Sequence, residues 1–137
     1  MPTRRRVLIL GAAGCAALSL VPAGRAAART WEEALADYAA GAELTEGGVI
    51  ITAPEIAENG QAVPITVEAP GATEILILNT RNPEPGVARV RFLEAAGAAM
   101  IATRIRLGET QDIIAVARLA DGRLAKAQVE IKVTIGG

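Results

Sequence analysis

Apolar and polar residues alternate along most of the chain after Gly47, with the period of two that is typical of β-strands having one buried face. In segment 127–135 every second residue is apolar: Ala127, Val129, Ile131, Val133 and Ile135. Shorter alternating segments predict strands at 63–67, 88–92 and 103–107. Longer apolar runs predict more central strands at 49–52, 74–79 and 112–119.

Turn residues separate these seven segments. They are Asn59-Gly60, Pro70-Gly71, Asn82-Pro83, Pro85-Gly86, Gly97 and Asp121-Gly122. Short strands at regular spacing, with no helix between them, predict an all-β fold: an antiparallel β-sandwich of about seven strands. Pro64 has no N–H group to donate, so its strand is expected to lie at a sheet edge or to start at this proline.

One short helix is predicted before the strands. Thr30 and Glu33 have the spacing of a capping box, in which each side chain bonds the other residue's backbone N–H. Apolar residues recur there at helical spacing: Trp31, Ala34, Leu35 and Tyr38. Gly41 is expected to end the helix. The apolar stripe is either a core-packing face or a docking face for a partner chain, with core packing favoured.

The first 28 residues have the composition of an export signal. Arg4, Arg5 and Arg6 precede an uncharged, largely apolar stretch at 7–21, which is too short for a membrane-spanning helix. Small residues at 26–28 fit a signal-peptidase site. The arginine pair Arg4 and Arg5 predicts a twin-arginine signal, with an ordinary secretory leader as the alternative. Both alternatives predict a periplasmic protein with no membrane contact after cleavage.

The residue types that are missing exclude whole classes of chemistry. The chain has no histidine, and its one cysteine (Cys15) and one serine (Ser19) lie in the predicted leader. Histidine-dependent catalytic triads, imidazole metal sites and disulfide frameworks are therefore excluded from the mature chain. Cys15 is interpreted as a leader residue and not as a lipid-attachment site, because Ala12 stands where such sites usually have leucine.

The acidic and basic residues point to no cofactor, metal or nucleic acid. The formal charge is −1, which gives no electrostatic case for a nucleic-acid partner. The carboxylates are scattered, without the spacing of a calcium loop. Glu55 and Glu58 flank the Asn59-Gly60 turn and could form an acid/base pair, but the mature chain has only three aromatic residues to bind a sugar. We therefore interpret both as solvated loop carboxylates and predict that the chain is not an enzyme.

A possible docking face comes from four arginines. The segments 87–93 and 99–107 are expected to form a hairpin around Gly97. This hairpin would place the arginines on one exposed face: Arg89, Arg91, Arg104 and Arg106. Neighbouring guanidinium groups attract an anion or an acidic protein surface. The alternative is an exposed face that only keeps the sheet soluble.

The last predicted strand runs directly into Gly136 and Gly137. Because glycine has no Cβ, this pair is expected to begin a flexible C-terminal arm. The predicted layout is thus a signal peptide at 1–28, a β-sandwich domain with an N-terminal helix at 29–135, and the start of the arm at 136–137.

Several motifs, in order along the chain, resemble those of the SoxY family. They are residues 54–60, Val63-Pro64, Asn82-Pro83, residues 103–107, Thr110-Gln111, Asp121-Gly122 and residues 133–137. The resemblance covers essentially the whole chain. It implies an immunoglobulin-like sandwich that pairs with SoxZ as a heterodimer in periplasmic thiosulfate oxidation. It also implies a Gly-Gly-Cys-Gly-Gly arm whose cysteine presents bound sulfur to SoxAX, SoxB and a sulfur dehydrogenase.

The given sequence matches this arm only at Gly136 and Gly137. The carrier cysteine is absent from it, and Cys15 cannot replace that cysteine because it lies in the leader. Two functions stay open at this point. One is a sulfur carrier whose thiol lies beyond the given sequence. The other is a non-catalytic sandwich that only docks SoxZ or a sulfur-oxidising enzyme.

Overall fold

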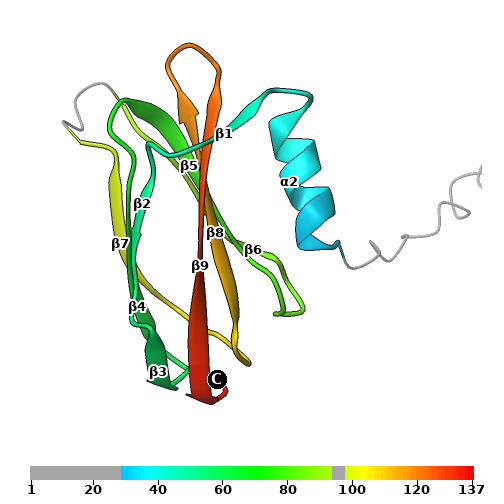
Figure 1. Cartoon of the computed structure of the whole chain (residues 1–137), viewed down its shortest axis with the longest axis vertical. Coiled ribbons are helices and arrows are strands. Elements are labelled where there is room, and N and C mark those ends of the chain that lie inside the picture. Colours follow the sequence, from blue (N-terminus) through cyan, green and yellow to red (C-terminus); the bar gives the residue numbers. More distant parts are fainter. Residues whose placement is uncertain (1–28, 94–97) are drawn as a thin grey trace, which may run out of the picture.

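One helix and nine strands form the structure of residues 29–93 and 98–137, which are the residues that the computed structural model describes (Figure 1). The helix is α2 (Trp31–Ala39). The strands are β1 (Leu44–Glu46), β2 (Ile50–Thr52), β3 (Ile56–Asn59), β4 (Val63–Glu68), β5 (Ala72–Asn79), β6 (Gly86–Arg91), β7 (Met100–Ile105), β8 (Gln111–Leu119) and β9 (Leu124–Ile135). The predictions for residues 1–28, including Arg4, Arg5 and Cys15, lie outside the described residues, as does the predicted turn at Gly97.

The strands form two sheets packed face to face (Figure 1). The larger sheet has the order β1-β9-β8-β5-β6, with β3 also paired to β9, and the smaller sheet has the order β2-β4-β7. β5 and β8 have strand neighbours on both sides, as their long apolar runs predict. The same prediction is wrong for 49–52, because β2 is an edge strand of the smaller sheet. The predicted all-β sandwich with one N-terminal helix is confirmed.

Two strand pairings within the described residues depart from the predicted antiparallel pattern. β1 and β3 both run parallel to β9, Leu44 pairing with Leu124 and Ala57 with Val133. Between them β2 crosses to the smaller sheet and pairs with β4. The first part of the sandwich therefore alternates between the two sheets along the side of β9. β1 and β3 were not predicted, because three or four residues are too few to show alternation.

Helix α2 covers the outer face of the larger sheet. Its capping box is formed as predicted, since the Thr30 hydroxyl accepts from the Glu33 N–H and the Glu33 carboxylate accepts from the Thr30 N–H. Leu35 and Tyr38 are buried in a cluster with sheet residues, namely Leu76, Leu78, Ile114, Val116 and Leu124. The apolar stripe thus packs on the chain's own domain. The helix ends at Ala39, where Ala40 takes the left-handed conformation ahead of Gly41.

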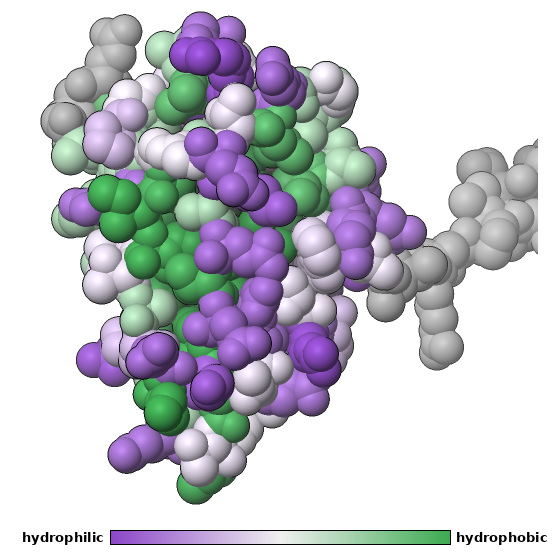
Figure 2. Space-filling model, viewed as in Figure 1, coloured by the Kyte–Doolittle hydropathy of each residue, from purple (hydrophilic) through white to green (hydrophobic). Residues whose placement is uncertain are grey.

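The main core lies between the two sheets. Ile75, Ile77, Ile113 and Ile131 of the larger sheet meet Ile65 and Val67 of β4 there, and all are at most 2% exposed. Figure 2 shows apolar side chains over β2 and in the seam between β2 and β9, beside a line of hydrophilic side chains along β9. No helix among residues 29–93 and 98–137 is long and apolar enough to span a membrane.

Pro64 lies one residue after the start of β4, which is the middle strand of the smaller sheet. The edge position is therefore wrong for the strand as a whole, whereas the alternative, a strand that starts at this proline, holds to within one residue. However, β2 pairs with β4 only from Thr66 to Glu68, so at Pro64 the strand has β7 as its partner and no second neighbour in the described residues. The missing N–H group is thus tolerated there.

Candidate functional site

The C-terminal end of β9 is held by two other segments of the chain. The Gly60 N–H, directly after β3, donates to the Ile135 carbonyl at 2.7 Å. The Gly60 carbonyl accepts from the Leu107 N–H at 2.7 Å, and the Leu107 carbonyl accepts from the Gly137 N–H at 2.9 Å. We call the three residues Gly60, Leu107 and Gly108, which contact Gly136 and Gly137, the C-terminal collar. The Gly137 N–H, in the glycine pair that was expected to begin a flexible arm, is thus hydrogen-bonded to the domain.

A buried amide network fixes the collar to the larger sheet. Gln111 is 2% exposed, and its Oε1 accepts from the backbone N–H groups of Arg81 and Asn82 at 3.0 and 3.2 Å. Its Nε2 donates to Asn82 Oδ1 at 2.7 Å, and the same oxygen accepts from the Gly108 N–H at 3.0 Å. Asn82 Nδ2 in turn donates to the Arg106 carbonyl at 2.7 Å. Five of the motifs that resemble the SoxY family therefore meet at this end of the molecule: residues 54–60, Asn82-Pro83, residues 103–107, Thr110-Gln111 and residues 133–137.

The predicted hairpin of segments 87–93 and 99–107 is wrong. β6 pairs with β5 in the larger sheet, and β7 pairs with β4 in the smaller sheet. Arg89 and Arg91 share the helix-covered face of the larger sheet with Glu74, whereas Arg104 alternates with the inward-facing Ile105. The alternation predicted correctly that these arginines are exposed, but it did not specify the sheet. The four arginines therefore do not form one face.

Arg89 and Arg91 instead surround a buried carboxylate. Glu74 is 4% exposed, and its carboxylate accepts from the Arg89 Nε–H at 3.0 Å and from the Arg91 Nε–H at 3.4 Å. The ring of Tyr38 lies beneath two guanidinium groups, 5.2 Å from that of Arg89 and 4.9 Å from that of Arg118. Arg118 also donates to the Tyr38 carbonyl at 3.2 Å. These contacts fasten helix α2 to β5, β6 and β8.

The electrostatics of this cluster follow from burial and charge. Burial alone would raise the pKa of Glu74, but the Tyr38 hydroxyl, Arg89 and Arg91 together lower it below its usual value of 4.5. Burial raises the pKa of the Tyr38 hydroxyl, and the neighbouring Glu74 carboxylate raises it further. Both groups thus keep their ordinary charge states at neutral pH. The cluster has the character of a structural ion pair rather than of a proton-transfer site.

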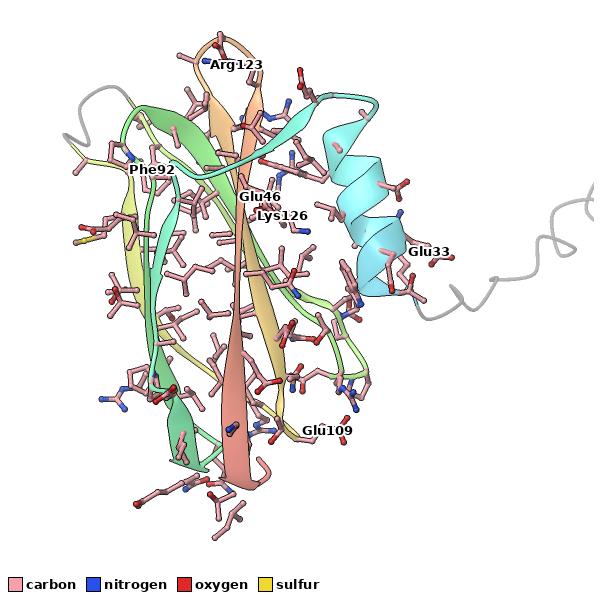
Figure 3. The ribbon with its side chains drawn as sticks, viewed as in Figure 1. Glu33, Glu46, Phe92, Glu109, Arg123 and Lys126 are labelled. Atoms are coloured by element: carbon pink, nitrogen blue, oxygen red, sulfur yellow. The ribbon has the colours of Figure 1, made fainter. Side chains whose placement is uncertain are left out.

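Arg104 and Arg106 lie next to the collar. Arg106 immediately precedes Leu107, and Arg104 is exposed two residues earlier on β7. No carboxylate within the described ranges forms an ion pair with either guanidinium group. Figure 3 shows Glu109 at this end of the molecule and Arg123, in the turn between β8 and β9, at the opposite end. Of the four predicted docking arginines, these two are the ones near the C-terminal end of β9.

The remaining candidate residues form no reactive site. Glu55 and Glu58 are exposed on either side of the start of β3, and the Glu55 carbonyl accepts from the Lys132 N–H. Among residues 29–93 and 98–137, no three carboxylates or thiols come together in a way that could hold a metal ion.

Sequence reasoning missed Glu74 and Gln111. Glu74 follows the alternation expected of an exposed position, yet helix α2 covers that face. The available signal was the apolar pair Leu76 and Leu78, which lies on the same face and shows that both faces of β5 are buried. For Gln111, the sequence held no comparable signal.

The comparisons with known proteins agree with this fold and with the motifs. The family model described as "Sulfur oxidation protein SoxY" matches residues 35–137. The sulfur carrier protein SoxY from Chlorobium limicola f thiosulfatophilum is 36% identical, with a TM-score of 0.68 over 80% of this chain and 100% of that one. The superoxide reductase (neelaredoxin) from Ignicoccus hospitalis is 21% identical, with a TM-score of 0.57 over 64% of this chain and 80% of that one, and shows the fold alone. No curated protein sequence matches the chain.

Proposed function

Because the chain belongs to the SoxY family of sulfur oxidation proteins, we propose that it is a carrier of the sulfur intermediates of thiosulfate oxidation and not itself an enzyme. The observation that supports this proposal most strongly is the family match across residues 35–137, which includes the glycine pair that begins the family's arm. Residues 29–137 contain no cysteine. The proposal therefore places the carrier thiol after Gly137, where the resemblance puts the cysteine of the arm.

Only a thiol suits this task among protein side chains. A thiolate and thiosulfate can join through a new S–S bond, with two electrons leaving to an electron acceptor such as the haem-containing partner that the resemblance implies. The product is a thiosulfonate on the cysteine sulfur. A later thiolate attack or reduction cleaves the S–S bond again, so the cysteine is regenerated. Hydroxyl and carboxylate groups form no such reversible bond.

The test is mass spectrometry of the C-terminal peptide from protein purified out of thiosulfate-grown native cells. We expect a peptide that extends past Gly137, contains one cysteine and has the added mass of bound sulfur or thiosulfate. Treatment with a thiol reductant should remove the added mass completely. Protein from cells grown without reduced sulfur is the control and should have the free thiol.

A native peptide that stops at Gly137, or one without cysteine, would contradict the carrier proposal.

The same preparation tests the partner and the location of the protein. We propose a heterodimer with a SoxZ-like protein in the periplasm, reached through the twin-arginine signal at Arg4 and Arg5. A SoxZ-like chain should therefore co-purify from the periplasmic fraction, and the chain should start near residue 29.

We further propose that Arg104 and Arg106 steer the carrier's enzymes to the C-terminal end of β9. Exposed charges of one sign accelerate encounter with an acidic surface. The double variant Arg104→Glu with Arg106→Glu should slow reconstituted thiosulfate oxidation severalfold and make the rate less sensitive to salt. Arg123→Glu, the same change at the far end of the molecule, is the control and should leave the rate unchanged. Equal rates for all three proteins would show that these arginines only keep the sheet soluble.

A further inference from the structure

We propose that the C-terminal collar is the fixed root of the carrier arm. Gly136 and Gly137 are then positioning residues that stay on the domain while only the residues after them move. This inference rests on the proposed carrier function and adds where the movement begins. It also assigns a role to Gly60, which otherwise looks like an ordinary turn glycine.

The hydrogen bonds of the collar join three segments that are distant in the sequence. Gly60 stands at the centre, because its N–H binds Ile135 and its carbonyl binds Leu107. The Leu107 carbonyl then extends the series to Gly137, two residues beyond the end of β9. Leu107 is fully buried in the main core, so this acceptor is held in place. The Gly137 N–H is thereby bound to a loop residue whose side chain is anchored in the core.

Close packing explains why residues 60, 136 and 137 are glycines. A Cβ on Gly60 would overlap the Leu107 carbonyl oxygen and lie 2.9 Å from the Gly137 nitrogen. A Cβ on Gly136 would overlap the Gly108 carbonyl oxygen, and one on Gly137 would lie 2.5 Å from the Gly60 oxygen. Gly60 and Gly136 do not have the left-handed backbone conformation that calls for glycine elsewhere in the chain. Glycine is therefore needed here for close contact, not for freedom of movement.

The collar sits on a rigid support. Gly108 donates to Asn82 Oδ1, and Asn82 is held by the buried Gln111. Thr110 adds a further tie, because its hydroxyl accepts from the Val133 N–H at 2.9 Å. Two hydrogen bonds thus link the segment before β8 to the end of β9: Gly137 N–H to the Leu107 carbonyl, and Val133 N–H to the Thr110 hydroxyl. These hydrogen bonds connect the end of β9 to Gln111 of β8, the middle strand of the larger sheet.

A fixed root limits where the carried sulfur can go. Successive Cα atoms are about 3.8 Å apart, so a thiol one residue beyond Gly137 stays close to the collar. The enzyme must therefore bring its active site up to this end of the molecule, next to the collar and to Arg106.

Amide hydrogen exchange of the full chain, followed by NMR, tests the collar directly. We expect the Gly137 N–H to exchange at least about tenfold more slowly than a glycine in an unstructured peptide. Gly136→Ala should abolish this protection, while Ile114 and Val116 of the core keep theirs. Gly86→Ala is the matched control, since a Cβ there meets nothing within 4 Å, and it should leave Gly137 protected. If Gly136→Ala does not fold, Asn82→Ala serves instead, because it removes the acceptor of the Gly108 N–H.

Exchange of the wild-type Gly137 N–H at the rate of an unstructured glycine would overturn the proposal. Unchanged protection in both Gly136→Ala and Asn82→Ala would overturn it as well. This readout needs no bound sulfur, so it is separate from the carrier test. The exchange rate decides whether the root is fixed, and the mass of the C-terminal peptide decides whether sulfur is carried.

Discussion

Gln111→Ala is expected to lower the free energy of unfolding by about 2–3 kcal/mol, a large effect for a single polar residue at the start of a strand. The substitution removes the acceptor of two backbone N–H groups, those of Arg81 and Asn82. It also removes the donor that orients Asn82 toward Gly108. The magnitude follows from the cost of leaving polar groups unpaired in a partly buried place, not from the net value of the bonds themselves. Urea denaturation followed by fluorescence of Trp31 measures it.

The matched control is Gln128→Ala. Gln128 is exposed on β9, and its side chain makes one hydrogen bond, to the Asp112 carboxylate. This change should alter the free energy of unfolding by no more than about 0.5 kcal/mol. Equal stability of the two variants would mean that water satisfies the groups that Gln111 now binds.

Glu74→Gln is expected to destabilise the folded protein by about 1–2 kcal/mol at neutral pH. Glutamine has nearly the same volume as glutamate, so the change keeps the packing and removes only the negative charge that binds Arg89 and Arg91. The side chains of these arginines are 59% and 76% exposed, and solvent therefore screens part of the attraction. The expected loss of free energy of unfolding is therefore smaller than for breaking a fully buried ion pair.

The pH dependence separates the charge from the shape of Glu74. Its folded-state pKa is lower than its usual value of 4.5, so folding favours the ionised form. The stability from this group is complete above about pH 4.5 and is lost as pH falls through the lower folded-state pKa. The difference between wild type and Glu74→Gln should therefore shrink below pH 4.5. Glu68→Gln, an exposed glutamate on β4, is the control and should show no such convergence; a constant difference at Glu74 would contradict the charge-based account.

The layered fold could be predicted from the sequence because alternation reports which side of a strand is buried. Val63, Ile65 and Val67 face the core as the pattern requires, and so do Ile113 and Ile131. The helix was equally clear, since its capping box and its apolar stripe depend on spacing within nine residues. These features are local, and local patterns are what a single sequence displays.

Strand partners could not be predicted in the same way. β6 and β7 each show one buried and one exposed face, but nothing in either segment specifies its neighbour. The short link between them suggested a hairpin, whereas the chain passes from one sheet to the other. The pairing is decided by the packing of the whole sandwich, which lies beyond the range of any local pattern.

The collar was missed for a related reason. Asn59-Gly60 has the composition of a turn and Gly136-Gly137 that of a loose end, and both interpretations treat glycine as a source of freedom. In the folded chain these glycines allow backbones from three distant segments to approach closely. The sequence contained the residues but not their proximity.

The parallel pairing of β1 and β3 with β9 has a consequence for how the protein folds. Thr45 of β1 binds the Leu124 carbonyl, 79 residues away in the sequence, and β3 pairs with the last residues of β9. Such non-local pairing slows the search for the native topology, because a long loop must close before the contacts that stabilise it can form. While the ribosome is still making β9, β1 and β3 lack the strand with which they pair. The sandwich therefore cannot be completed before β9, the last strand of the larger sheet to be made, is available.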